Sequence, residues 1–190
     1  MMIPDGAALL VIDVQKGFDA PGWGGRNNAS AEDVVAQLLE AWRSAGWPVI
    51  HAQHVSLEPG SALGPGQAGV EIKPEAEPRA GEPVFQKSVN SAFIGTGLED
   101  HLRSEGIESL VMAGLTTNHC VSTTARMAGN LGFRTFVVAD ATATFDRLGP
   151  DGTVYPADLV HAVSLASLHE EFAVVVPSAD VLAAVAASGD

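Results

Sequence analysis

A carboxyl group, an amine and a thiol stand where buried strands of this 190-residue chain are expected to end. They belong to Asp13, Lys87 and Cys120, and Cys120 is the only cysteine. A carboxylate can take the proton of a thiol, an ammonium can stabilise the negative charge that results, and the sulfur can then attack an electrophilic carbon. Together the three types predict nucleophilic catalysis, provided that the fold brings them into one crevice.

Cys120 lies in the stretch Gly114–Thr124, between a predicted strand at Ser109–Ala113 and a predicted helix at Cys120–Leu131. In the first helical turn, free backbone N–H groups and the positive end of the helix dipole favour a thiolate over a thiol. The backbone N–H groups of the bend from Leu115 to Cys120 are natural donors to an oxyanion. The competing interpretation is that Cys120 is a small buried hydrophobic residue, which is the usual fate of a lone cysteine.

Apolar runs alternate with helical patterns along nearly the whole chain. The predicted strands are 7–12, 48–53, 83–86, 109–113, 134–139 and 172–176. The predicted helices are 31–45 (capped by Ser30 with Asp33), one from 96 or 97 to 105, 120–131, 156–168, and one from 178 or 179 to 187. This alternation predicts a single α/β domain over residues 1–190, with a six-stranded parallel sheet between two helical layers. With strand order 3-2-1-4-5-6, Asp13 and Cys120 follow adjacent strands and Lys87 follows the third, so all three reach the carboxyl edge.

The segment from Ser56 to Pro83 is rich in proline and glycine, which predicts a long loop without regular structure. Such a loop serves as a lid over a site or as a contact between subunits. Within it, the stretch 64–69 reads Gly-Pro-Gly-Gln-Ala-Gly and matches a dinucleotide-binding pattern. No strand precedes this stretch and no helix follows it, so we reject the match.

Composition excludes several classes of partner. The formal net charge is −13 and no cluster of Lys and Arg occurs, which argues against nucleic acid and anionic membranes. The early apolar run, Ala7–Ile12, is too short to cross a bilayer. One cysteine cannot form an internal disulfide, and the first residues carry no signal-like pattern, so we expect a cytoplasmic protein with a small-molecule substrate.

Three motifs in the chain resemble those of the isochorismatase-like cysteine hydrolase superfamily, which includes nicotinamidase and N-carbamoylsarcosine amidohydrolase. They are Val11–Gln15 with Phe18, Gly81–Val84 leading to Lys87 and Asn90–Phe93, and Gly114–Val121. The resemblance implies a catalytic triad of Asp13, Lys87 and Cys120. It also implies a non-proline cis peptide at Leu115–Thr116, an oxyanion hole built from the N–H groups of Thr116 and Cys120, and assembly as a homo-oligomer, either a dimer or a tetramer.

The chain departs from the nicotinamidase branch where that branch binds a metal through an Asp-x-His motif. The corresponding stretch here runs from His51 to Ser56 and has no aspartate, and His51 and His54 should point to opposite faces of a strand. We therefore expect no metal and no cofactor. The predicted substrate pocket is aromatic and partly polar, and consists of Phe18, Trp23, Gln53, Asn90, Phe93, His119 and Phe145.

Two points about this pocket stay open. His119 is either a substrate contact or a core histidine that holds the bend. The pocket has no arginine of its own, which disfavours a strongly anionic substrate unless a neighbouring subunit lends Arg26 or Arg147.

These features predict an amidohydrolase that cleaves a small carboxamide or ureido C–N bond through a thioester on Cys120. One alternative is the hydrolysis of a vinyl ether of the isochorismate type, for which the resemblance implies no need of the thiol. Another is a non-catalytic or redox-sensing protein in which Cys120 reacts with peroxide.

Overall fold

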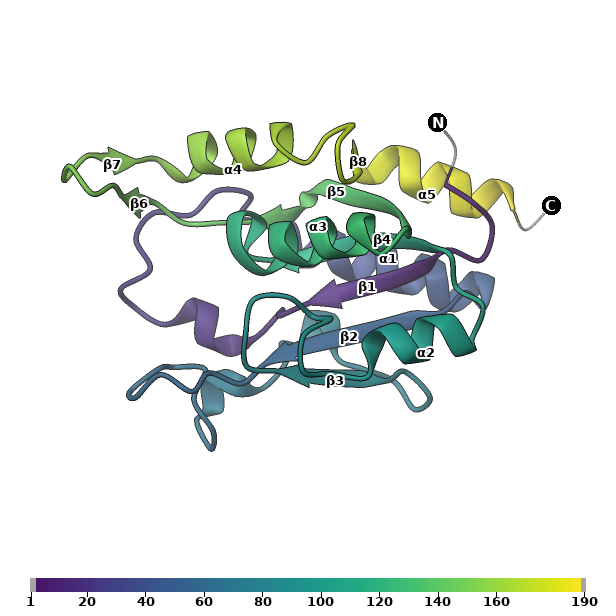
Figure 1. Cartoon of the computed structure of the whole chain (residues 1–190), viewed down its shortest axis with the longest axis horizontal. Coiled ribbons are helices and arrows are strands. Elements are labelled where there is room, and N and C mark those ends of the chain that lie inside the picture. Colours follow the sequence, from purple (N-terminus) through teal and green to yellow (C-terminus); the bar gives the residue numbers. More distant parts are fainter. Residues whose placement is uncertain (1–2, 189–190) are drawn as a thin grey trace.

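The computed structural model of the protein describes residues 3–188. Within them, six strands form one parallel sheet in the order β3-β2-β1-β4-β5-β8, which confirms the predicted three-layer architecture (Figure 1). The strands are β1 (Ala8–Ile12), β2 (Val49–His54), β3 (Val84–Lys87), β4 (Ser109–Leu115), β5 (Arg134–Ala143) and β8 (Val174–Val176). The chain places β2 and β3 on one side of β1 and then returns to place β4 on the other side, parallel to β1. The carboxyl ends of β1 and β4 therefore frame a crevice.

Helices cover both faces of the sheet, and Figure 1 shows α2 and α3 in front of it and α1 behind it. The helices are α1 (Ala31–Ala45), α2 (Leu98–Ser104), α3 (Ser122–Asn130), α4 (Ala157–Ala166) and α5 (Ser178–Ala187). None of the helices within residues 3–188 has the length and apolar character that crossing a membrane requires.

The central strand β1 shows why the sheet is buried on both sides. Successive side chains of a strand point to opposite faces. Leu10 and Ile12 pack with residues of α2, α3 and α4, whereas Leu9 and Val11 pack with residues of α1 and α5. The uninterrupted apolar sequence of this strand is therefore the expected pattern for a strand between two helical layers.

Two local predictions need correction. Ser30 is the N-cap residue of α1, as predicted, but its side chain makes no capping hydrogen bond to the described part of α1, and the Ala31 N–H donates to the carbonyl of Asn28. Residues 146–152 are rich in turn signals, which predicts a loop, but the segment after β5 forms a short antiparallel hairpin of β6 (Arg147–Leu148) and β7 (Val154–Tyr155). Asp151 shapes its turn by accepting hydrogen bonds from Thr153.

The long loop 56–83 packs against the body and contains two 3-10 turns, η2 (Ala68–Val70) and η3 (Pro74–Ala76), which the sequence prediction missed. Gln15, which precedes the 3-10 turn η1 (Lys16–Asp19), donates to the carbonyl of Val70 at 2.8 Å. Gly69 lies so close to the backbone that an added Cβ would stand 2.1 Å from the Ala62 carbonyl oxygen and 2.9 Å from the Cα of Gly17. The glycine of the rejected dinucleotide match thus permits close packing of the loop.

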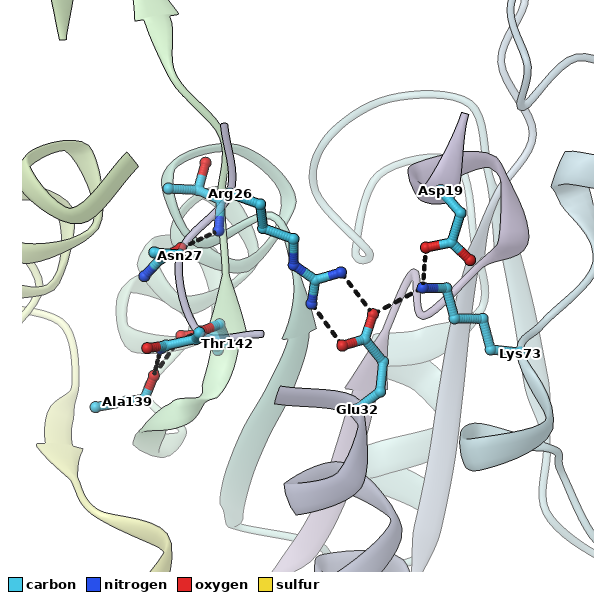
Figure 2. A network of polar contacts seen from close by, with 9 residues as sticks. Asp19, Arg26, Asn27, Glu32, Lys73, Ala139 and Thr142 are labelled. Atoms are coloured by element: carbon cyan, nitrogen blue, oxygen red, sulfur yellow. Dashed lines mark hydrogen bonds and ion pairs between the residues drawn. The ribbon is translucent and has the colours of Figure 1, made fainter. Parts of the chain in front are cut away.

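A buried ion network also fixes this loop (Figure 2). Lys73 lies between two carboxylates, 2.8 Å from Glu32 of α1 and 2.5 Å from Asp19 of η1. Arg26 binds the same Glu32 carboxylate with two nitrogens. The network therefore joins the loop, η1, the segment before α1 and α1 itself.

Candidate active site

The fold brings the amine, the carboxyl group and the thiol together. The Nζ atom of Lys87 lies 2.6 Å from Oδ2 of Asp13 and 3.3 Å from Sγ of Cys120. The side chains of Asp13 and Lys87 are fully buried. They come from the ends of β1 and β3, and Cys120 comes from the bend that follows β4. Lys87 is itself the last residue of β3 rather than the first residue after it.

Asp13 occupies a special backbone position. Its φ is +51°, in the left-handed region that residues other than glycine seldom adopt. The neighbouring strand β4 carries Gly114, with φ of +122°, and a Cβ there would lie 2.0 Å from the carbonyl oxygen of Ile12. Glycine at this position therefore lets β4 approach the residue that precedes the carboxylate.

The bend that carries Cys120 is a single π-helical turn, η4 (Thr117–Val121), and α3 begins after it at Ser122. The Val121 N–H donates to the carbonyl of Thr116, five residues earlier, at 3.2 Å. The Leu115–Thr116 peptide is cis, as the family resemblance predicted. Cys120 thus lies in a π turn that leads into the helix, rather than in the first turn of the predicted α-helix.

Electrostatics correct the expectation of a thiolate. Burial, followed by the nearby charge of Asp13, raises the pKa of the Cys120 thiol to about 12. Loss of hydration can shift a pKa by several units, whereas a helix terminus supplies only a partial charge. Burial also raises the pKa of Asp13, although the charge of Lys87 opposes the shift. The sulfur is therefore a protonated thiol that needs a base, and Asp13 is the adjacent one.

The structure adds a residue that the sequence reasoning set aside. The Nδ1 atom of His54 lies 3.3 Å from Nζ of Lys87, and His54 lines the same cavity as Cys120. The signal that identifies it is the strand register, because His54 and Lys87 are directly paired residues of β2 and β3. His51 faces the other way, as predicted, and its Nε2 contacts Glu82 at 3.0 Å.

Asp13, His54 and Cys120 are also the one cluster among the described residues with metal-ligand chemistry, since their ligand atoms lie within 4.8 Å of one another. Lys87 makes a hydrogen bond to each of these three residues. A metal ion held by the same atoms would compete with an ammonium for one position and would repel it. The cluster therefore does not fit a metal, and Lys87 supplies its positive charge.

The thiol opens into a cavity of about 100 Å³. Its lining comprises Phe18, Trp23, His54, Leu63, Asn90, Thr116, His119 and Cys120. Phe18, Trp23, Asn90 and His119 were predicted pocket residues, whereas Leu63 of the long loop was not. His119 lies exposed at the rim, which rules out the core position that was its alternative. A larger hollow of about 490 Å³ beside Trp47 and Glu82 contains no thiol.

Three predicted pocket residues do not line this cavity. Phe145 is buried behind it and stacks on Trp23 with ring centroids 5.3 Å apart, so it supports the aromatic wall. Phe93 packs on Phe133 in the core. Gln53 points away along β2 and donates to the carbonyl of Val70. Strand ends identified the right region, but the direction of each side chain depended on register and packing.

The bend itself is held by side chains that the sequence did not reveal. Thr117 contacts Nδ1 of His161 on α4 through its hydroxyl at 2.9 Å. The next residue, Asn118, accepts a hydrogen bond from Thr144. The backbone N–H of Thr144 in turn donates to Oδ1 of Asn27 at 2.7 Å. Polar contacts from α4 and β5's carboxyl end thus fix the turn that presents the sulfur.

Arg26 and Arg147, the two arginines that a neighbouring subunit could contribute to the pocket, have different surroundings. Arg26 is engaged by Glu32 within its own chain. Arg147 has its Nε and Nη2 atoms buried without a hydrogen-bond partner among residues 3–188. Partial desolvation and then the charge of Arg147 lower the pKa of His119, so Arg147 acts on the rim of the cavity from the same chain.

Comparison with known proteins agrees with this geometry. The family model of the isochorismatase domain matches residues 7–180. The chain belongs to the isochorismatase family. It is 49% identical to the isochorismatase family protein YrdC of Bacillus subtilis over 168 residues, which cover 88% of this chain and 90% of that protein.

A solved structure extends the match to three dimensions. The crystal structure of an isochorismatase family member from Chromobacterium violaceum has a TM-score of 0.93 at 50% identity and covers 97% of this chain and 95% of its own. Nicotinamidase 3 of Arabidopsis thaliana is 33% identical over 154 residues, covering 74% of this chain and 75% of the relative. This isochorismatase family member is an enzyme, and its class is that of the hydrolases.

Proposed function

We propose that this isochorismatase family member is a cysteine-dependent amidohydrolase that cleaves a small carboxamide or ureido C–N bond. The observation that carries the proposal is the ammonium of Lys87 held between the Asp13 carboxylate and the thiol of Cys120, which lines the cavity. The name of the related nicotinamidase supports hydrolysis of an amide. A cavity of about 100 Å³ suits a small acyl group better than a large substrate.

In the first half of the reaction, Asp13 takes the thiol proton while the sulfur attacks the carbonyl carbon of the substrate. The negative charge moves from the carboxylate to the sulfur and then to the carbonyl oxygen, and Lys87 stays close to the first two positions. The backbone N–H groups of Thr116 and Cys120 would stabilise the oxyanion. Thr116 lines the cavity, so its N–H is placed to do this.

In the second half, the C–N bond breaks as Asp13 returns its proton to the leaving nitrogen, which departs as ammonia or an amine. A water molecule then gives a proton to Asp13 and attacks the thioester carbon. The C–S bond breaks, the carboxylic acid leaves, and the proton returns to sulfur. Each turn consumes one amide and one water and restores the thiol, so no redox cofactor is required.

Two finer features belong to the same proposal. The mechanism needs a reduced thiol, and the cytoplasm keeps thiols reduced, which favours that compartment. A sensor of peroxide, in contrast, needs a thiolate of lowered pKa. The raised pKa of Cys120 therefore disfavours the redox-sensing alternative.

The test uses the single cysteine. With a panel of small primary amides, Cys120→Ala should lower turnover about 10³-fold or more, because loss of a nucleophile removes the covalent step. Intact mass of the wild-type protein quenched during turnover should show an added acyl group on Cys120. Cys120→Ala that still hydrolyses amides would refute the proposal, and Cys120→Ala that retains hydrolysis of isochorismate would support the vinyl-ether alternative.

A further inference from the structure

The ammonium of Lys87 has three acceptors around it. A lysine ammonium carries three N–H donors and no acceptor. Its neighbours are Oδ2 of Asp13 at 2.6 Å, Sγ of Cys120 at 3.3 Å and Nδ1 of His54 at 3.3 Å. Asp13 and Cys120 have chemical roles in the proposed reaction, whereas His54 has none so far. Because Lys87 can only donate, Nδ1 of His54 must be the unprotonated nitrogen of the ring.

The backbone of His54 is fixed from the opposite side. Gln15 is fully buried, and its side-chain amide grips the His54 peptide twice. Its Nε2 donates to the His54 carbonyl at 2.9 Å, and its Oε1 accepts from the His54 N–H at 2.9 Å. On the other edge of β2, the register pairs His54 with Lys87. The imidazole thus stands at a fixed place beside the ammonium.

We infer that His54 is a positioning residue whose Nδ1 holds the Lys87 ammonium against both Asp13 and Cys120. The role of His54 in catalysis rests on the amidohydrolase function proposed above. When the ring is neutral, the third N–H of Lys87 is engaged and the other two point to the carboxylate and the sulfur. When the ring gains a proton, Nδ1 becomes a donor, and two cations 3.3 Å apart repel each other.

The charged and titratable groups that face His54 set the pH at which its imidazole ring gains a proton. Lys87 reaches it from β3, Asp13 from the end of β1 and Cys120 from η4, while His119 stands at the rim of the cavity. Burial, and then the charge of Lys87, lower the pKa of His54 below its ordinary 6.5, although Asp13 and a hydrogen bond to the backbone of Val89 oppose the shift. Protonation therefore occurs on the acid side of neutrality.

Alkylation of Cys120 by iodoacetamide tests this without a known substrate. Intact mass reports the rate between pH 4.5 and 9, and Cys120 is the only thiol in the chain. His54→Asn places an amide oxygen near the Nδ1 position that accepts a hydrogen bond and cannot be protonated. His54→Leu removes the acceptor. At pH 8 we expect His54→Asn to react within about threefold of the wild type, and His54→Leu about tenfold or more slowly.

The acid limb gives the second readout. In the wild type, both Asp13 and His54 take up protons as the pH falls, whereas in His54→Asn only Asp13 does. The fall in rate should therefore begin at lower pH, and be less steep, in His54→Asn. His51→Asn is the matched control, since the same substitution lies three residues earlier on the opposite face of β2. Its profile should match the wild type.

Several outcomes would overturn the inference. They are a His54→Leu variant that reacts as fast as the wild type, a His54→Asn variant that reacts as slowly as His54→Leu, and an acid limb of His54→Asn that does not move. Nitrogen NMR of the wild-type protein gives a check that needs no variant, because a protonated Nδ1 on neutral His54 would contradict it. Failure of the hydrolase proposal would give a different result. Amides would not be hydrolysed, but the pH profiles of alkylation would still differ between the wild type and the His54 variants.

Discussion

At the scale of single residues, the site is a buried ion pair beside a neutral thiol. The side chains of Asp13 and Lys87 compensate each other where neither is exposed to solvent, and the second carboxylate oxygen of Asp13 has no hydrogen-bond partner among residues 3–188. That free oxygen can receive the proton of Cys120 without breaking the contact with Lys87. Buried pairs of this kind add little net stability, but removing one partner leaves a charge that is costly to bury.

Lys87→Met should therefore abolish activity and also destabilise the fold. We expect a loss of about 3–5 kcal/mol in the free energy of unfolding at pH 8, because ionised Asp13 is left unpaired. The pKa of Asp13 in the folded protein is already above its ordinary value, and loss of Lys87 removes an opposing charge. A raised carboxyl pKa means that stability falls as pH rises through that pKa, so the deficit should shrink toward acid. Urea unfolding at several pH values measures it.

The matched control is the double variant Asp13→Asn with Lys87→Met. It carries no buried charge at the site and should recover most of the stability while remaining inactive. A single variant Lys87→Met that is as stable as the wild type at pH 8 would contradict the burial argument.

At the scale of elements, a second carboxylate ties the opposite end of β2 to its neighbours. Glu82 accepts hydrogen bonds from Nε of Arg43 on α1 at 2.7 Å and from the N–H of Arg79 at 2.8 Å. His51 of β2 completes the contacts. Burial acts to raise the pKa of Glu82, but these hydrogen bonds, led by Arg43, lower it to about 2. Glu82 thus holds the end of the long loop against α1 and β2.

This contact should appear in the pH dependence of stability. A carboxyl pKa that is lowered on folding contributes stability above the unfolded value of 4.5, and the contribution is lost as pH falls from 4.5 through about 2. Glu82→Gln should lower the free energy of unfolding by about 3 kcal/mol at pH 7, and the difference from the wild type should narrow toward pH 2. Urea unfolding at pH 7, 4.5 and 3 checks this.

The control for Glu82 is Glu40→Gln. Glu40 pairs with Arg79 at the surface, where both side chains are more than half exposed, and such pairs contribute less than about 1 kcal/mol. An equal effect of the two substitutions at pH 7, or a Glu82→Gln difference that persists unchanged at pH 3, would contradict the assignment.

At the scale of the whole molecule, one part of the surface is unusually apolar. The β6–β7 hairpin extends beyond the sheet in line with α4 (Figure 1). Leu148 and Val154 of the hairpin and Leu159 and Val163 of α4 are all exposed, between 48% and 74%. Leu159 and Val163 are four residues apart and so share one face of the helix. Exposed apolar surface of this kind marks sites of association.

We therefore expect the protein to form homo-oligomers through α4 and the hairpin. Light scattering after size-exclusion chromatography should give at least twice the mass of one chain, and Leu159→Glu with Val163→Glu should shift it to the monomer. Leu57→Glu tests the other expectation, that loop 56–83 is a subunit contact, because Leu57 is exposed on that loop. A monomeric wild type, or dissociation by Leu57→Glu alone, would contradict the expected interface.

Sequence alone determined the architecture and the three central residues. The apolar runs were long, continuous and separated by helical patterns, which predicts a parallel sheet with right-handed crossovers, and the strand order assumed for it is the common doubly wound one. Asp13, Lys87 and Cys120 were recognisable because each followed such a run and because their types form a coherent chemical set. Both predictions depend on the local pattern of apolar and polar residues and on the fold that this pattern favours.

Tertiary structure alone decided what each side chain faces and how strongly it is hydrated. His54 became a neighbour of Lys87 through the register of β2 and β3, and Gln53, one residue earlier, turned away for the same reason. The pKa of Cys120 is raised because burial outweighs the effect of the helix terminus. Register, burial and the electrostatic field are sums over residues distant in sequence, so no local pattern encodes them.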